Sequence, residues 1–316
     1  MKSPTIRSEP GLLVCSLASG SRGNSTYVGT LECGLLVDVG ISAKRAAELL
    51  RRRDLDPDAV SGILVTHEHR DHSAGVRVFC RRHRVPVYVQ HDVRPEVDLR
   101  GVDDVRTFAG DAPFDVAGFR VDPFPIPHDT VEPLGYVIER DGCRVGVATD
   151  MGMRTRLAEE RLSACGAVLL EFNHDLEMLI EGPYPWWLKQ RVKGRLGHLS
   201  NDDALEMLEV LVGGSVRTVM LGHLSQENNR PELVEAMVRD RLASLDRPDV
   251  DVTVLEQDRP GPVIGVSRSE TVPVCRTTET ESESESETES ETESESESES
   301  ESRSEPQTAL FVGGKA

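Results

Sequence analysis

Apolar residues along this chain fall into short runs separated by Gly, Ser and Asp, with longer amphipathic stretches between some of the runs. Runs of this length, bounded by turn residues, predict β-strands. The predicted strands are 11–17, 25–30, 34–40, 62–67, 86–90, 119–126, 134–140, 143–150, 167–172, 218–223 and 250–256. A helical spacing of apolar residues predicts helices at 42–53, 73–83, 155–165, 200–212 and 229–244, of which the fourth begins with the capping pair Ser200 and Asp203.

The order of these elements indicates the fold class. Clustered strands come first, and strands then alternate with helices in each half of the chain. This order predicts an α/β protein in which two sheets pack face to face with helices on the outside, a four-layer αββα sandwich. We expect this sandwich to form a single domain over residues 1–270.

Residues 271–316 have a different composition from the rest of the chain. From Glu279 to Glu305, Glu alternates with Ser or Thr, so that no face of the segment could pack, and we expect a disordered tail. The tail holds thirteen glutamates against three basic residues, a net charge of −10, which leaves −9 of the chain's −19 for residues 1–270. An acidic surface of this kind binds nucleic acid only through a local basic patch or a bound metal.

The cysteines and the first ten residues indicate the cellular compartment in which the protein is expected. The six cysteines form no CxxC pair, and most lie in or beside apolar runs, which favours buried thiols over disulfides or a cysteine metal site. The first ten residues lack the apolar core of a secretory signal, and no run is long enough to cross a bilayer. We therefore expect a cytoplasmic protein that does not bind membranes.

The densest group of reactive side chains follows the predicted strand at 62–67, in "VTHEHRDHS". His67 and His69 are two residues apart in extended backbone, so both imidazoles can point to one place. Asp71 and His72 follow as the chain turns into a helix. Two imidazoles suit one metal ion, and a carboxylate with a third imidazole suits a second, with zinc or a similar divalent ion preferred.

One loop cannot complete two metal sites, so further ligands are expected at other strand ends. His128, Asp150 and His223 are each the first ionisable residue after an apolar run. If their strands are adjacent, all three side chains open onto one edge of a sheet. Taken alone, each of them also fits a turn or capping role.

The motifs at these positions resemble those of a known family. In order, "THEHRDH", "PH" at 127–128, "TDMG" at 149–152 and "GH" at 222–223 resemble the metallo-β-lactamase-fold superfamily over residues 11–267. The resemblance implies an αββα sandwich with its site at the strand edge. It further implies two metal ions with these ligands: His67, His69 and His128 for one, Asp71, His72 and His223 for the other, and Asp150 as the bridge. The true β-lactamases mostly carry Cys in place of Asp150, which argues against antibiotic hydrolysis.

Three further stretches narrow the resemblance. "SLASGSRGNSTYV" at 16–28, "LLEFNHDLEML" at 169–179 and "YPWWLKQRVKGRLGHLSN" at 184–201 look like the WalJ/YycJ-type, nuclease-like subgroup of the superfamily. The resemblance implies a phosphodiesterase or exonuclease that acts on single-stranded DNA or RNA. Zn²⁺ is the expected metal, with Mn²⁺ as the alternative.

The third stretch also carries positive charge against the acidic background. Between residues 188 and 199 there are four Lys and Arg and no acid, which indicates phosphate contact, or else one solvated helix face. The expected substrate contacts are Lys189, Arg191, Ser200 and Asn173. The tandem Trp186 and Trp187 fit either stacking on bases or a core plug beside a proline.

The mechanism that follows is hydrolysis by a water activated between two metal ions. Asp71 would orient this water, and His198 would contact the phosphate or protonate the leaving oxygen. Two other functions fit the scaffold: hydrolysis of a small thioester or lactone, and a non-catalytic metal-binding regulator. The pattern leaves open the choice of DNA or RNA, the polarity of attack, the oligomeric state, and the roles of the tail and of His174.

Overall fold

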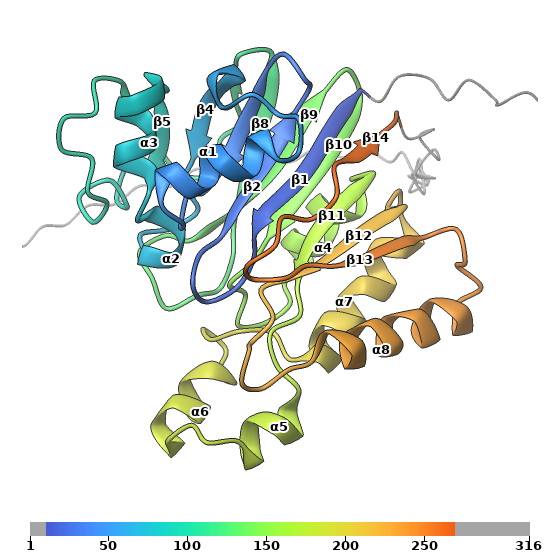
Figure 1. Ribbon diagram of the computed structural model, residues 1–316. Coiled ribbons are helices and arrows are strands. Elements are labelled where there is room, and N and C mark those ends of the chain that lie inside the picture. Colours follow the sequence, from blue (N-terminus) through green and yellow to red (C-terminus); the bar gives the residue numbers. More distant parts are fainter. Residues whose placement is uncertain (1–10, 269–316) are drawn as a thin grey trace, which may run out of the picture. The chain divides into compact units, whose positions relative to one another are not determined.

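The computed structural model describes residues 11–268, which form two seven-stranded sheets packed face to face with helices on their outer faces (Figure 1). The strand order is β14-β1-β2-β3-β4-β5-β6 in the first sheet and β13-β12-β11-β10-β9-β8-β7 in the second. The four-layer α/β sandwich expected from the order of the elements is confirmed.

The first sheet comes mainly from the N-terminal half of the chain. Its strands are β1 (Leu12–Ala18), β2 (Ser25–Gly29), β3 (Gly34–Val37), β4 (Val60–Leu64), β5 (Val87–Gln90), β6 (Val105–Phe108) and β14 (Ile264–Val266). The strands from β3 to β6 are parallel, and the others pair antiparallel. The helices of this half are α1 (Ala43–Arg51), the 3₁₀ turn Pro57–Ala59, α2 (Arg70–Ser73) and α3 (Val76–His83).

The second sheet comes from the C-terminal half. Its strands are β7 (Phe114–Val116), β8 (Phe119–Pro125), β9 (Leu134–Arg140), β10 (Cys143–Ala148), β11 (Ala167–Glu171), β12 (Thr218–Gly222) and β13 (Asp251–Val254). The strands from β10 to β13 are parallel. Its outer face is covered by α4 (Arg156–Ser163), α7 (Asn201–Gly213) and α8 (Pro231–Ser244), whereas α5 (Leu176–Glu181) and α6 (Trp186–Val192) project from the layers (Figure 1).

The core has three layers, one between the sheets and one under each set of helices. Because both faces of the central strands are buried, these strands are nearly continuous apolar runs, which is why the sequence pattern located them. The pattern missed β6, β7 and β14, which are edge strands of three or four residues with partly exposed side chains. It also missed α5 and α6.

The predicted helix at 73–83 is divided in the structure. Helix α2 ends at Ser73 and α3 begins at Val76, with Gly75 between them. A side chain at Gly75 would meet the backbone oxygen of Ile41 at 2.1 Å, so this turn packs tightly against the loop before α1. The predicted cap of α7 is present, since the Asp203 backbone N–H donates to Ser200 Oγ at 3.1 Å.

Several expectations concern features outside the layers. The five cysteines of residues 11–268 are all free thiols, and four of them are buried, as predicted. Within the same residues, no helix has the length and apolar character that a bilayer crossing requires. The disordered acidic tail expected at 271–316 lies outside the described residues.

Candidate metal centre

The seven predicted metal ligands come shortly after strands, on loops or in the short helix α2. His67, His69, Asp71 and His72 follow β4, His128 follows β8, Asp150 follows β10, and His223 follows β12. The parallel strands β10, β11 and β12 end at the same edge of their sheet, which places the residues that follow them close together. The structure brings all seven side chains to this edge.

The first group of ligands consists of His67, His69 and His128. One nitrogen atom from each ring lies within 4.8 Å of the corresponding atoms of the other two, the spacing of ligands around a single cation. The Nδ1 atom of His128 is 3.0 Å from the backbone oxygen of Gly197, to which it can donate. This bond fixes the orientation of the ring and leaves Nε2 of His128 free to bind a metal ion.

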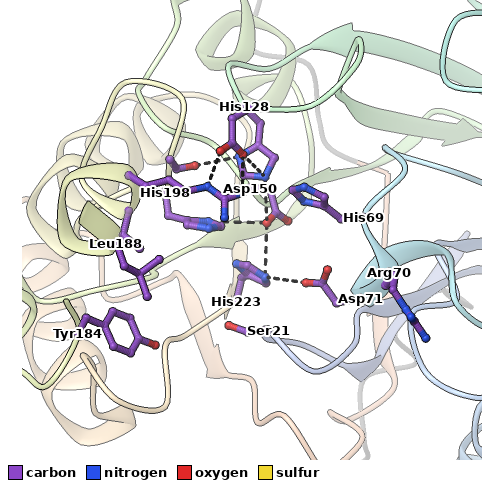
Figure 2. Close-up of a pocket in the computed structure, with 14 residues that line it drawn as sticks. Ser21, His69, Arg70, Asp71, His128, Asp150, Tyr184, Leu188, His198 and His223 are labelled. Atoms are coloured by element: carbon purple, nitrogen blue, oxygen red, sulfur yellow. Dashed lines mark hydrogen bonds and ion pairs between the residues drawn. The ribbon is translucent and has the colours of Figure 1, made fainter. Parts of the chain in front are cut away.

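The second group consists of Asp71, His72 and His223, whose ligand atoms also lie within 4.8 Å of one another. Asp150 lies between the groups. Its Oδ2 is 3.0 Å from His72 Nε2, and its Oδ1 is 3.5 Å from His223 Nε2 and 3.9 Å from His128 Nε2. Figure 2 shows this carboxylate at the middle of the site. The two groups of His and Asp side chains are consistent with a dinuclear metal site.

Unpaired atoms in the site fit bound cations. Nε2 of His67 and Nε2 of His223 are buried and have no hydrogen-bond partner among residues 11–268. A buried polar atom without a partner costs about 1–3 kcal/mol, and bound divalent ions would satisfy both atoms. Imidazole and carboxylate ligands suit Zn²⁺ and related ions.

The backbone at three strand ends is held in a sparsely populated conformation. Asp38, Asp150 and His223 have φ values of 61°, 61° and 55°, in the left-handed region that residues with a side chain seldom occupy. Each costs of order 1 kcal/mol, and all three side chains belong to the metal centre or touch a ligand in it. The strained backbone at these three positions turns the side chains toward the site.

Asp38 and Thr66 are buried side chains that support the segment from His67 to His72, which carries four of the predicted ligands. Asp38 Oδ2 is 2.7 Å from His72 Nδ1 and accepts a hydrogen bond from Thr66 Oγ1 at 2.8 Å, while Asp38 Oδ1 accepts from the Thr66 backbone N–H. Burial lowers the pKa of His72, but the carboxylates of Asp150 and Asp38 outweigh burial and raise this pKa well above its usual value. The bond to Asp38 at Nδ1 orients His72 so that its Nε2 faces Asp150 and the other predicted ligands.

Glu171, at the end of β11, orients His198 and His223 as Asp38 orients His72. Its Oε1 atom is 2.8 Å from Nδ1 of both His198 and His223, and its Oε2 accepts from the Met151 backbone N–H at 2.7 Å. Burial raises the pKa of Glu171, but the two histidines outweigh burial and lower it to about 2. Glu171 was not among the predicted site residues, although it is an acid at the end of an apolar run, the same signal that located Asp150.

His198 lies on the loop that connects α6 to α7, and it lines the pocket above the metal ligands. Its Nδ1 is bonded to Glu171 and lies 3.6 Å from Asp150 Oδ1. The Nε2 atom is therefore the ring nitrogen available to a bound substrate. The sequence-based prediction placed His198 in the reaction, and the geometry is compatible with that role.

The loop at 19–24 connects the two halves of the site. The backbone N–H of Asn24 donates to the backbone oxygen of Asp71 at 2.7 Å, and Asn24 Nδ2 is 2.9 Å from His72 Nε2. At the other end of the loop, Ser19 Oγ accepts from the His223 backbone N–H at 2.8 Å. Ser21 lines the pocket between these anchors (Figure 2). The loop therefore contacts predicted ligands that follow strands of both sheets, and it fixes their positions relative to one another.

An open pocket of about 340 Å³ leads to the metal ligands. Tyr184 and Leu188 form one wall, across the pocket from Asp71 and Arg70 (Figure 2). Arg191, a predicted substrate contact, also lines the pocket, where its Nη2 is 3.2 Å from Oδ1 of Asp129. The pocket therefore places a guanidinium group beside the metal ligands.

The other three predicted substrate contacts lie outside the residues that line this pocket. Lys189 Nζ donates to the Ile180 backbone oxygen at 2.6 Å and ties α6 to α5. Asn173 is buried and donates to the His223 backbone oxygen at 3.0 Å, while Ser200 caps α7. In the structure these side chains support the site rather than face it.

His174, whose role the sequence left open, is buried, and its Nδ1 has no partner in the described part of the chain. Burial lowers its pKa to about 4, so the ring is neutral at physiological pH. It belongs to none of the His and carboxylate groups that could hold a metal among residues 11–268.

Comparison of the sequence with known proteins identifies the family to which the chain belongs. Residues 35–224 match the family described as "Beta-lactamase superfamily domain". The exodeoxyribonuclease YycJ of Bacillus anthracis is 36% identical over 240 residues, which cover 72% of this chain and 88% of that protein. The exodeoxyribonuclease WalJ of Streptococcus pneumoniae is 35% identical over 245 residues, which cover 76% of this chain and 91% of that protein.

A solved structure supports the fold independently. The metallo-β-lactamase fold protein YhfI of Bacillus subtilis aligns with a TM-score of 0.59 at 13% identity, over 79% of this chain and 98% of that one. The sequence match, the two facing sheets and the His and Asp groups at the strand ends lead to one conclusion. The chain belongs to the metallo-β-lactamase superfamily and is a metal-dependent hydrolase related to YycJ and WalJ.

Proposed function

We propose that the chain is an exonuclease that hydrolyses DNA phosphodiester bonds at strand ends with unpaired bases, with two Zn²⁺ or Mn²⁺ ions as cofactors and the cytoplasm as its place of action. The observation that carries the proposal is the position of Asp150 between two ligand groups at the base of a pocket that also contains Arg191. Both relatives are named exodeoxyribonucleases, and the aligned region spans most of their length.

The proposed ligands follow the two groups. His67, His69 and His128 would hold one ion, Asp71, His72 and His223 would hold the other, and Asp150 would be shared between them. The chemistry supplied by two bound divalent ions is a nucleophile formed from water near neutral pH, together with neutralisation of charge on the phosphate.

Asp71 is proposed to orient the attacking water. Both carboxylates line the pocket, and Asp71 is the more accessible of the two, since its side chain is 26% exposed and that of Asp150 is 2% exposed. Its Oδ2 atom lies 3.7 Å from His72 Nε2 and 3.9 Å from His223 Nε2. At this position the carboxylate can accept a proton from water and align it for attack on the phosphorus.

His198 is proposed to protonate the leaving oxygen. Glu171 Oε1 lies 2.8 Å from Nδ1 of His198 and holds the ring so that Nε2 is the nitrogen left for the substrate. His198 can then carry a proton on Nε2 and deliver it across the pocket. Arg191 is proposed to contact a phosphate oxygen, while Asp129 holds its guanidinium group in place.

The test is hydrolysis of end-labelled single- and double-stranded DNA by purified, metal-loaded protein, with RNA, a small thioester and a lactone as alternative substrates. We expect release of nucleotides from DNA ends and no turnover of the thioester or lactone. Asp71→Ala should abolish DNA hydrolysis and keep the folded structure, whereas Asp111→Ala, on an exposed loop, should leave activity unchanged. Normal activity of Asp71→Ala would refute the assignment of Asp71.

A further inference from the structure

Both tryptophans of the chain are consecutive residues exposed at the surface, and the proposed mechanism does not use them. Trp186 is 67% exposed and Trp187 is 66% exposed, at the start of α6. The core-plug alternative considered from the sequence is therefore wrong. Exposing two large aromatic side chains to water is unfavourable, so a role in binding is the physical reason to place them there.

The tryptophans are next to the pocket. Tyr184, just before α6, and Leu188, Arg191 and Val192 within it all line the pocket. On a helix, residues three or four apart share a face, so Trp187 lies on the same face as Arg191. Trp187 therefore stands at the rim, one helical turn from the guanidinium group beside the metal ligands.

Charge on this segment favours an anionic partner. Residues 182–200 carry four Lys and Arg and no acid, within a body whose net charge is −9. Lys193 Nζ lies 5.5 Å from the centre of the Trp186 ring, which keeps a cation beside the exposed indole. Aromatic rings interleaved with cations suit single-stranded nucleic acid, because bases stack on the rings while cations contact the backbone.

The two helices are held in place before any ligand binds. Lys189 Nζ donates to the Ile180 oxygen and joins α6 to α5, and the Asp175 backbone N–H at the start of α5 donates to the Asn228 oxygen at 2.9 Å. Figure 1 shows α5 and α6 projecting from the layers at the end where the site lies. A platform that is already ordered loses little conformational entropy on binding.

On the basis of the proposed nuclease function, we propose that Trp186 and Trp187 are a stacking platform for the unpaired bases next to the phosphodiester bond being cleaved. The base at the strand end stacks on Trp187, and the following base stacks on Trp186. The phosphate between the metal ions and Trp187 contacts Arg191. This surface selects single-stranded DNA ends, and it sets which phosphodiester bond reaches the metal ions.

The platform can be tested with the fluorescence of the same residues, since the chain has no other tryptophan. The full, metal-loaded protein is titrated with a phosphorothioate oligothymidylate, which resists hydrolysis, and with an abasic oligomer of equal length and charge. We expect the thymidylate to quench the emission and the abasic oligomer to bind at least about tenfold more weakly, the size expected from loss of stacking.

Variants extend the test to turnover. Trp187→Ala and Trp186→Ala should each lower the ratio of kcat/KM for single-stranded DNA to that for bis(p-nitrophenyl) phosphate by about tenfold, and Trp187→Phe should restore part of the loss. The matched control is Val210→Ala, which removes an exposed apolar side chain on α7 and should leave the ratio unchanged.

Three outcomes would overturn the platform: equal affinity for the thymidylate and abasic oligomers, an unchanged ratio in both Trp→Ala variants, or a dimer in which a second copy of the chain covers both indoles. Failure of the proposed nuclease function is a separate result. In that case the wild-type protein hydrolyses neither DNA nor bis(p-nitrophenyl) phosphate at any metal concentration, whatever its fluorescence shows.

Discussion

Glu171 connects the metal site to the residue that is proposed to deliver a proton. One of its oxygen atoms contacts Nδ1 of both His198 and His223, and the other accepts a backbone hydrogen bond from Met151. With a pKa of about 2, the carboxylate is ionised at every pH at which the enzyme could work. Glu171 is thus a positioning residue that holds two imidazoles in the tautomer and orientation they need.

The role of His198 gives a prediction about leaving groups. His198→Ala should lower the rate of DNA hydrolysis by about 10²–10⁴-fold, the usual contribution of a general acid. The same variant should hydrolyse a p-nitrophenyl ester of thymidine phosphate with a much smaller loss, because nitrophenolate leaves without protonation. Steady-state kinetics on the two substrates measure the difference.

His91→Ala is the matched control, since this histidine is exposed on a turn and contributes to none of the metal-binding groups found in residues 11–268. It should behave as wild type on both substrates. Equal losses of His198→Ala on DNA and on the nitrophenyl ester would contradict a proton-donating role and indicate a role in phosphate binding instead.

At the scale of elements, the site depends on how closely α2 approaches the loop after β3. Gly40 packs against the Asp71 backbone, where a side chain would meet the Asp71 oxygen at 1.6 Å. The Asn24 backbone N–H donates to this same oxygen, and the Val39 backbone N–H donates to the His72 oxygen at 2.9 Å. Two segments, the loop at 19–24 and the loop after β3, therefore fix the position of Asp71 and His72.

Substitution of Gly40 should damage both stability and activity. Gly40→Ala is expected to lower the free energy of unfolding by about 1–3 kcal/mol, as overpacking does elsewhere, and to displace Asp71 enough to reduce activity strongly. Denaturant unfolding and the DNA assay measure the two effects. Gly213→Ala, with open space around its added methyl group, should be neutral or stabilising. Wild-type stability in Gly40→Ala would show that the loop can move away without cost.

The sequence predicted those elements whose apolar pattern is unambiguous. Central strands such as β3 and β11 are buried on both faces and read as uninterrupted apolar runs. Short edge strands such as β14 lack that pattern because one face is exposed. Helix α6 buries none of its residues, so it has no apolar stripe by which to find it.

For the site, the rule that functional residues follow strands located the potential metal ligands but not their supports. Asp38 and Glu171 also end apolar runs, but their importance depends on contacts with histidines far away in the sequence. For the same reason, the sequence could not show that Lys189 is engaged by α5 or that Asn173 faces the His223 backbone. Such contacts depend on tertiary packing.

At the scale of the whole molecule, the charge of the metal site links metal binding to pH. Burial lowers the pKa of His223, but the carboxylates of Asp150, Asp71 and Glu171 outweigh burial and raise this pKa to about 10. The pKa of His72 is also raised well above its usual value, by Asp150 and Asp38 acting against burial. In the metal-free protein both imidazoles are therefore protonated at neutral pH.

Metal binding should therefore release protons. A histidine must lose its proton before its nitrogen can bind a metal, so the apparent affinity should rise with pH between about 6 and 8, by about tenfold per pH unit for each proton displaced. Calorimetric titration of the metal-free protein with Zn²⁺, in buffers of different ionisation enthalpy, counts these protons. An affinity that is independent of pH would contradict the raised pKa values of His72 and His223.

In the proposed reaction, two metal ions that share Asp150 as a ligand would act together in DNA hydrolysis. The most direct measurement is the rate of nucleotide release from end-labelled single-stranded DNA as metal-free protein receives known equivalents of Mn²⁺ or Zn²⁺. We predict that the rate rises until two equivalents per chain are bound and that Asp150→Ala stays inactive throughout. Full activity at one equivalent, or activity that survives complete removal of metal, would contradict the account.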